Sequence, residues 1–104
     1  MTTLEKLAAT IASRQGQPKE SSYTAKLLQG GPEKCAKKFG EEAFELAMAA
    51  VLNNKTNTTN EAADVFYHLL VLLQSTGVSL SDVMAVLEAR EGTSGLVEKA
   101  NRNG

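Results

Sequence analysis

The sequence predicts an all-α fold, a bundle of four main helices with short additional helical segments, in which helices from two subunits pack together. Apolar residues recur at three- and four-residue spacing in four segments, and capping residues or glycines bound these segments. No run alternates apolar and polar residues for long enough to indicate a strand. With 104 residues, 42% of them apolar, the chain is expected to form one domain over residues 1–104.

The first main helix is expected over residues 2–15, because Thr2 and Glu5 have the spacing of a capping box. Its apolar face is formed by Leu4, Leu7, Ala8 and Ile11. A segment with a glycine, a proline and a serine then breaks the helix. After it, Ser22 is expected to cap a short helix over residues 23–29, which ends at two consecutive glycines.

Two long helices follow, and a polar connector over residues 53–57 separates them. Pro32 fits the first turn of the earlier helix, which is expected to end near residue 52. The apolar stripe of that helix is expected to consist of Cys35, Ala36, Phe39, Ala43, Leu46, Ala47 and Ala50. Thr58 and Glu61 have the spacing of a second capping box, which predicts that the later helix begins at this point.

The fourth main helix is expected to begin after Ser79, which forms a third capping-box pattern with Asp82, and to end at Gly92. Its apolar positions are Leu80, Val83, Met84 and Leu87. The remaining residues, 93–104, are expected to be a polar tail with at most one helical turn.

Residues 65–73 are apolar on nearly every side of the helix that contains them. Such a helix is normally buried, and a four-helix domain of this size can scarcely cover it alone. We therefore expect one side of it to pack against a second copy of the chain in a homodimer. The alternative is a central helix within the monomer.

Charge, cysteine content and hydropathy narrow the setting of the protein. Eleven basic and twelve acidic residues give a net charge of −1, which does not favour nucleic acid as a partner. The single cysteine, Cys35, permits no internal disulfide and no thiolate metal cluster. Residues 69–73 form a purely apolar run that is too short to cross a membrane, and the N-terminus lacks the pattern of a signal peptide. A cytoplasmic protein is expected.

Four carboxylates are the candidate metal ligands: Glu42, Glu45, Glu61 and Asp64. Glu42 and Glu45 are three residues apart, as are Glu61 and Asp64, so each pair lies on one helix face. In an antiparallel hairpin, residues at equal height have position numbers with a constant sum. This sum is the same for Glu45 with Glu61 as for Glu42 with Asp64, so the two pairs are expected at matching heights. Oxygen ligands favour Mg²⁺, with Mn²⁺ as the alternative. The competing interpretation is that these are ordinary solvated charges.

Further side chains flank the predicted cluster. Glu41 is a candidate to activate water or bind a second metal, and the competing interpretation is a plain surface residue. Lys38, one turn before the cluster, is the candidate for a phosphate contact. His68, one turn after it, is interpreted as a core histidine rather than a substrate ligand. Tyr23 and Tyr67 are interpreted as packing residues rather than as platforms on which a base stacks.

The spacing of the carboxylates resembles the metal motif of the all-α nucleoside triphosphate pyrophosphohydrolases, which include MazG and dimeric dUTPases. Within that superfamily, the chain resembles the phosphoribosyl-ATP pyrophosphohydrolases of histidine biosynthesis. The closer resemblance is carried by Ser-Tyr-Thr-Ala-Lys-Leu at 22–27, by residues 31–34, 37–42 and 61–70, and by Ser-Gly-Leu-Val-Glu-Lys-Ala at 94–100. Cys35 and Phe44 depart from the small or aliphatic residues expected at their positions, which concerns packing only.

The resemblance implies a MazG-like fold and magnesium-dependent hydrolysis of phosphoribosyl-ATP to phosphoribosyl-AMP and pyrophosphate. It implies that the four carboxylates hold Mg²⁺ and that Glu41 or the metal activates water. It also implies that Lys38 and Lys34 contact phosphates, and that Lys26 and Lys99 contact the phosphoribosyl part. The chain is expected to be the stand-alone form, without the cyclohydrolase fused to this domain in many bacteria. Two alternatives remain, a house-cleaning nucleoside triphosphate pyrophosphatase and a non-catalytic helical dimerisation module.

Overall fold

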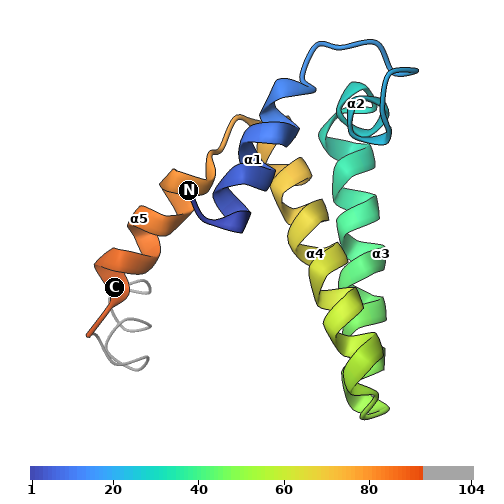
Figure 1. The fold of residues 1–104 in the computed structure, drawn as a ribbon, viewed down its shortest axis with the longest axis vertical. Coiled ribbons are helices and arrows are strands. Elements are labelled where there is room, and N and C mark those ends of the chain that lie inside the picture. Colours follow the sequence, from blue (N-terminus) through green and yellow to red (C-terminus); the bar gives the residue numbers. More distant parts are fainter. Residues whose placement is uncertain (93–104) are drawn as a thin grey trace.

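The fold is all-α, as the sequence predicts. A computed structural model describes residues 1–92 of the chain, and within this range every regular element is a helix (Figure 1). These helices are α1 (Thr3–Ser13), α2 (Tyr23–Gln29), α3 (Gly31–Val51), α4 (Lys55–Thr76) and α5 (Leu80–Arg90). The tail after residue 92, for which at most one helical turn is expected, lies outside the described residues.

Three helices begin where the sequence predicts, because their capping side chains form the expected hydrogen bonds. The backbone N–H of Glu5 donates to the Thr2 hydroxyl over 3.1 Å, and the Glu5 carboxylate accepts from the Thr2 backbone N–H over 2.9 Å. Ser79 and Asp82 form the same reciprocal pair at the start of α5. The hydroxyl of Ser22 accepts from a backbone N–H in the first turn of α2. Each cap satisfies donors that the first helical turn leaves without partners.

The start of α4 differs from the prediction. Asn54 is its N-cap and accepts a hydrogen bond from the backbone N–H of Asn57 over 3.0 Å, so the helix begins before Thr58. Thr58 lies in the first turn, where its hydroxyl donates to the Asn54 carbonyl over 2.7 Å. The predicted capping box of Thr58 and Glu61 is therefore wrong, since asparagine caps a helix at least as well as threonine. The tight connection is completed by Asn53 at a positive φ of 57°.

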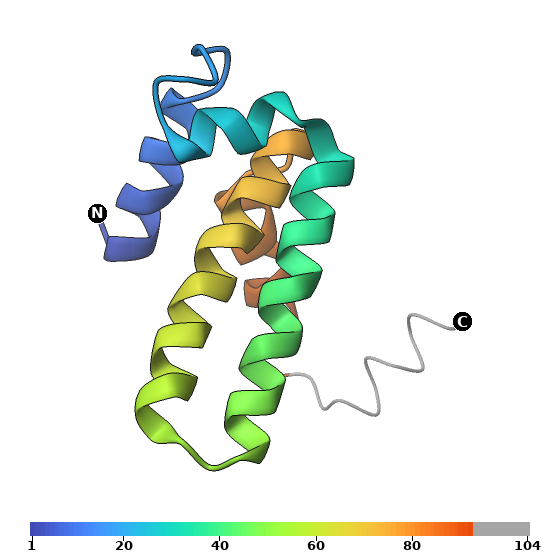
Figure 2. The ribbon, with the colours of Figure 1, turned by 90° about the vertical axis from the view of Figure 1, so that its right-hand side faces the viewer.

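The two long helices, α3 and α4, form an antiparallel hairpin, and α2 crosses one end of it (Figure 2). The core lies at that end and joins the first four helices. Its buried members are Ile11, Leu27, Leu28, Cys35, Leu70 and Val71. The Cys35 thiol donates to the Leu27 carbonyl over 3.3 Å, which ties α3 to α2. The core thus fixes the geometry of the hairpin, along which the candidate metal ligands lie.

The buried side of α3 is narrower than the predicted stripe. Cys35 and Ala49 are buried, but Ala36, Ala47 and Ala50 are exposed. Alanine is small and common on both faces of helices, so its position gives little directional information. The three exposed alanines correct the predicted stripe.

Segment 65–73 of α4 is only partly covered. Leu70 and Val71 are buried, whereas Phe66 is 52% exposed. Helix α5 makes few contacts with the other helices and exposes Met84, Val86 and Leu87. No single helix within residues 1–92 is long and apolar enough to cross a membrane, and only α4 and α5 together, bent by 108°, reach that length and composition.

Candidate metal centre

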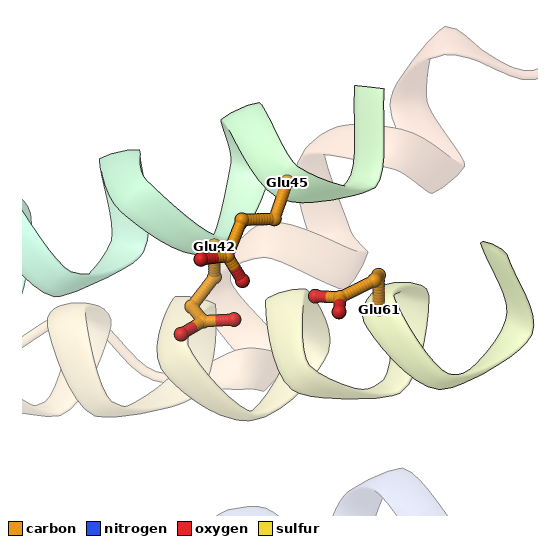
Figure 3. Close-up of side chains that lie close together, drawn as sticks. All are labelled: Glu42, Glu45 and Glu61. Carbon is orange, nitrogen blue, oxygen red and sulfur yellow. The ribbon is translucent and has the colours of Figure 1, made fainter. Parts of the chain in front are cut away.

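Three carboxylates from the two long helices meet on one side of the hairpin. Glu42 and Glu45 extend from α3 towards α4, where Glu61 extends towards them (Figure 3). Each side chain offers an oxygen, and these oxygens lie within 4.8 Å of one another. The i, i+3 spacing places the two α3 residues on one face, and the antiparallel pairing places Glu61 at their height. The arrangement could hold a metal ion.

Asp64 is the fourth predicted ligand and is not a member of this group of three. Its side chain is exposed, one helical turn beyond Glu61. It nevertheless lies close enough to raise the pKa values of both Glu42 and Glu61. The structure therefore brings three of the four predicted carboxylates together and leaves Asp64 beside them.

Burial and mutual repulsion make the cluster unfavourable for negative charge. The pKa of Glu42 is raised, first by burial and then by the carboxylates of Glu45, Asp64 and Glu61. The pKa of Glu61 is raised by burial and then by Glu45 and Asp64. In addition, the Oε2 atom of Glu61 is buried without a hydrogen-bond partner within the described residues. A cation would neutralise the repulsion and bind this oxygen, so the donor set fits a hard divalent ion.

Lys38 and Glu41 form an ion pair at the edge of the cluster. The Lys38 Nζ atom lies 3.5 Å from Glu41 Oε2, and the two side chains are 33% and 47% exposed. The pKa of Lys38 is raised, first by its electrostatic interaction with Tyr23 and then by Glu41. Glu41 is not in the group of three carboxylates. The pair therefore places one cation within a turn of Glu42 and leaves Glu41 facing solvent.

His68 is buried, with 6% of its surface exposed, as expected of a core histidine. Its ring makes T-shaped contacts with Tyr67 and Tyr23, with ring centroids 5.0 Å and 6.4 Å apart. Burial, followed by the charge of Lys38, lowers the pKa of His68 and favours the neutral imidazole. Its Nδ1 atom has no hydrogen-bond partner among residues 1–92, so the hydrogen-bonding capacity of this histidine is not fully satisfied.

The two tyrosines have different environments. Tyr67 is partly buried, and its hydroxyl is hydrogen-bonded to that of Thr24, so its predicted packing role is confirmed. Tyr23 packs against His68 in the T-shaped contact but is 54% exposed, so the packing covers only part of its ring. The only sequence signal for Tyr23 was its place in the 22–27 segment that carries the family resemblance.

The remaining predicted substrate contacts lie on the surface or beyond the described range. Lys26 on α2 and Lys34 in the first turns of α3 are both exposed, and neither belongs to the carboxylate group. The Lys34 side chain folds back over Gly30, where a Cβ atom would lie 2.3 Å from its Cδ. Lys99 lies outside the described residues.

A helical hairpin with carboxylates that converge from both long helices is characteristic of the all-α nucleotide pyrophosphohydrolases. The spacing of the carboxylates in this sequence resembles the metal motif of that class. Comparison with known families then identifies the particular one. The sequence model described as "Phosphoribosyl-ATP pyrophosphohydrolase" matches residues 4–91, and the chain belongs to this family.

Several similar proteins carry the name phosphoribosyl-ATP pyrophosphatase. One from Cereibacter sphaeroides is 61% identical over 102 residues, which cover 98% of this chain and 99% of the relative. One from Jannaschia sp. is 60% identical over 102 residues, which cover 98% of this chain and all of the relative. A third, from Methylobacterium radiotolerans, is 60% identical over 100 residues, with 96% and 94% covered.

Proposed function

We propose that this protein hydrolyses phosphoribosyl-ATP to phosphoribosyl-AMP and pyrophosphate, a step of histidine biosynthesis. The observation that carries the proposal is the family match over residues 4–91, which includes all three clustered carboxylates. High identity over nearly the whole length of the relatives supports the same chemistry. Concentrated negative charge in a helical hairpin suits a reaction on a polyphosphate, provided that a cation bridges enzyme and substrate.

The cation of this proposal is Mg²⁺, with Mn²⁺ as the alternative. Glu42, Glu45 and Glu61 would hold it directly, and Asp64 would complete the oxygen ligand set from the adjacent turn. Bound there, Mg²⁺ would supply charge neutralisation at the phosphates and lower the pKa of water. The raised pKa values of Glu42 and Glu61 and the unpartnered Glu61 oxygen support this assignment.

Lys38 would bind a substrate phosphate at the edge of the cluster. Its ion pair with Glu41 is partly exposed, and such pairs contribute little to stability, so a phosphate can replace Glu41 as the partner. Glu41 would then be released to accept a proton from the attacking water. Lys34 would contribute a further phosphate contact, and Lys26 and Lys99 would contact the phosphoribosyl part.

The assembly and the setting of the protein are part of the same proposal. The chain would act as one domain over residues 1–104, as a cytoplasmic homodimer without nucleic-acid or membrane partners. Exposed apolar side chains on α4 and α5, such as Phe66 and Leu87, support a second copy as the partner. A groove of about 590 Å³ between α1, α4 and α5, lined by residues that include Leu73, Leu80 and Met84, offers further apolar surface.

The test is pyrophosphate release from phosphoribosyl-ATP, with Mg²⁺ and with a chelator, beside a panel of ordinary and deoxynucleoside triphosphates. Release from phosphoribosyl-ATP alone, and only with Mg²⁺, is the expected result. Release from the panel instead would overturn the assigned substrate and favour a house-cleaning pyrophosphatase. The absence of release from every substrate would favour a non-catalytic helical module.

Two variants locate the reaction at the cluster. Glu45→Gln removes one ligand charge and is expected to abolish turnover while the helical content stays the same. Glu20→Gln, in the exposed loop between α1 and α2, is the matched control and is expected to keep full activity. Retained turnover in Glu45→Gln would overturn the proposed role of the cluster.

A further inference from the structure

Tyr23 is an aromatic residue that the fold leaves more than half exposed. It is the first residue of α2, and 54% of its surface is accessible. Its ring meets that of His68 nearly at a right angle, 89°, with the ring centroids 6.4 Å apart. A T-shaped contact uses at most one face of a tyrosine ring. The other face of Tyr23 is therefore free of this contact.

The ring is mounted rigidly. Ser22, immediately before it, caps α2 by accepting the backbone N–H of Ala25 over 3.0 Å. Thr24, immediately after it, is hydrogen-bonded through its hydroxyl to Tyr67 on α4. His68, beneath the ring, is buried. Both chain neighbours and the side chain that the ring contacts are thus held in place, so little backbone entropy remains to be lost when a planar group stacks on Tyr23.

Tyr23 also lies beside the hairpin that carries the carboxylates. Its ring contacts that of His68, which is one helical turn after Asp64 on α4. Lys38 is four residues before Glu42 on α3, a separation of about 5–6 Å on one helix face. From the carboxylate cluster, the next turn of the hairpin therefore brings Lys38 on α3 and, in contact with His68 on α4, the exposed ring of Tyr23. A nucleotide has the same order, with phosphates first and the base beyond them.

The hydrogen bonding of His68 is a second, independent observation at this corner. Its Nδ1 atom is buried without a partner in the described part of the chain, although buried polar atoms are nearly always paired. The unmet hydrogen bond of this buried imidazole, beside an exposed ring, leaves the corner open to a polar partner from beyond residues 1–92.

We propose that Tyr23 is the base-binding residue of the active site, with its exposed ring stacked on the purine of the substrate. The proposal rests on the function proposed above, since it takes the substrate to be a purine nucleotide. Base stacking on an aromatic side chain tolerates loss of the phenolic hydroxyl but not loss of the ring. This difference separates stacking from a contact made by the hydroxyl to Lys38 or to phosphate.

The experiment compares wild type, Tyr23→Phe and Tyr23→Leu in steady-state kinetics with phosphoribosyl-ATP and saturating Mg²⁺. We expect Tyr23→Leu to raise KM roughly tenfold to a hundredfold with a smaller change in kcat, and Tyr23→Phe to stay within about threefold of wild type. Equal KM values for wild type and Tyr23→Leu would overturn the proposal while leaving the proposed function intact. An equal loss in both variants would also overturn it, because the hydroxyl would then be the contact.

Binding of AMP, measured by calorimetry in the same three proteins, tests the inference without turnover. Wild type and Tyr23→Phe are expected to bind AMP more tightly than Tyr23→Leu by a similar factor. If wild type fails to cleave phosphoribosyl-ATP, the proposed function fails, and the AMP comparison still decides whether Tyr23 stacks on a purine. Equal AMP affinity in all three proteins would overturn the stacking. Unfolding of each variant in urea checks that the exposed position leaves stability unchanged.

Discussion

Glu42 on α3 and Glu61 on α4 offer carboxylate oxygens within 4.8 Å of each other, although they belong to different helices. The pKa of each is raised, with burial as the first cause and neighbouring carboxylates as the next. Both effects disfavour the ionised form that a metal requires. At neutral pH, the folded hairpin therefore brings negative charges close together. Binding of a divalent cation is expected to stabilise the folded state, and removal of the cation is expected to destabilise it.

The first prediction concerns this stabilisation by metal. A ligand that binds only the folded state adds about 2.7 kcal/mol when its concentration is 100 times the Kd. For a domain of this size each kcal/mol corresponds to roughly 4–8 °C in Tm. Mg²⁺ is therefore expected to raise the Tm relative to a chelator in wild type and in Glu20→Gln, and to raise it much less in Glu45→Gln. Thermal unfolding monitored by circular dichroism measures this, and an identical rise in all three proteins would contradict the proposed ligand set.

The second prediction concerns pH in the absence of metal. Glu42 and Glu61 have raised pKa values, so between the ordinary value of 4.5 and their folded values the native state binds more protons than the unfolded state. Their contribution to stability is present below that window and is lost as the pH rises through it. His68 has a lowered pKa and acts in the opposite sense below its ordinary 6.5. The comparison must therefore hold His68 constant.

The variant Glu61→Gln keeps the contribution of His68 constant, because it removes one of the two carboxylates and leaves the histidine in place. Relative to wild type, the metal-free variant is expected to gain stability at neutral pH and to lose this advantage as the pH falls towards 4.5. Urea unfolding in chelator at a series of pH values measures the difference. A stability difference that does not change with pH would show that Glu61 titrates in the folded state as it does when unfolded. The lowered pKa values of Glu5 and Asp82 act only in more acidic solution.

The hairpin and the height of its carboxylates could be predicted from sequence, but the direction of each side chain could not. A short connector makes consecutive helices antiparallel, and the equal sums of position numbers then place residues at matching heights. Rotation about the helix axis is set by tertiary packing, and each residue turns the direction by about 100°. Asp64 lies one helical turn from Glu61, but its side chain is exposed and outside the group of three.

The N-terminus of α4 shows a second limit and gives a third prediction. Two capping patterns occur within one turn of each other, and the earlier one, at Asn54, starts the helix. Asn54→Ala is expected to lower the free energy of unfolding by about 0.5–2 kcal/mol, because the N–H of Asn57 loses its acceptor. Thr58→Ala, the matched control, removes no cap and is expected to cost less. Urea unfolding of both variants measures the two losses in the free energy of unfolding. A larger loss in Thr58→Ala would indicate that Thr58, as the sequence predicts, is the cap.

The core gives a fourth prediction. Leu27 is 1% exposed and packs where α2 crosses the hairpin, so Leu27→Ala is expected to lower the free energy of unfolding by about 2–5 kcal/mol. Leu52→Ala, in the connector, is the control, because Leu52 is 73% exposed and leaves no cavity. Chemical unfolding of both variants compares the two losses. Equal losses would indicate that the exposed connector residue is covered in solution, which would move the subunit interface to that end of the hairpin.

The last prediction concerns assembly. Segment 65–73 of α4 exposes Phe66 even though the surrounding residues pack inward, and a large exposed aromatic residue in an apolar segment is characteristic of an interface. Light scattering after size exclusion is expected to give twice the chain mass of 11.1 kDa for wild type. Phe66→Glu buries a charge in that interface and is expected to give the monomer, with unfolding that no longer depends on protein concentration. Tyr23→Leu, which changes an equally exposed aromatic residue at the proposed base-binding position, is expected to remain a dimer. A monomeric wild type would contradict the interface, and a dimeric Phe66→Glu would move it away from α4.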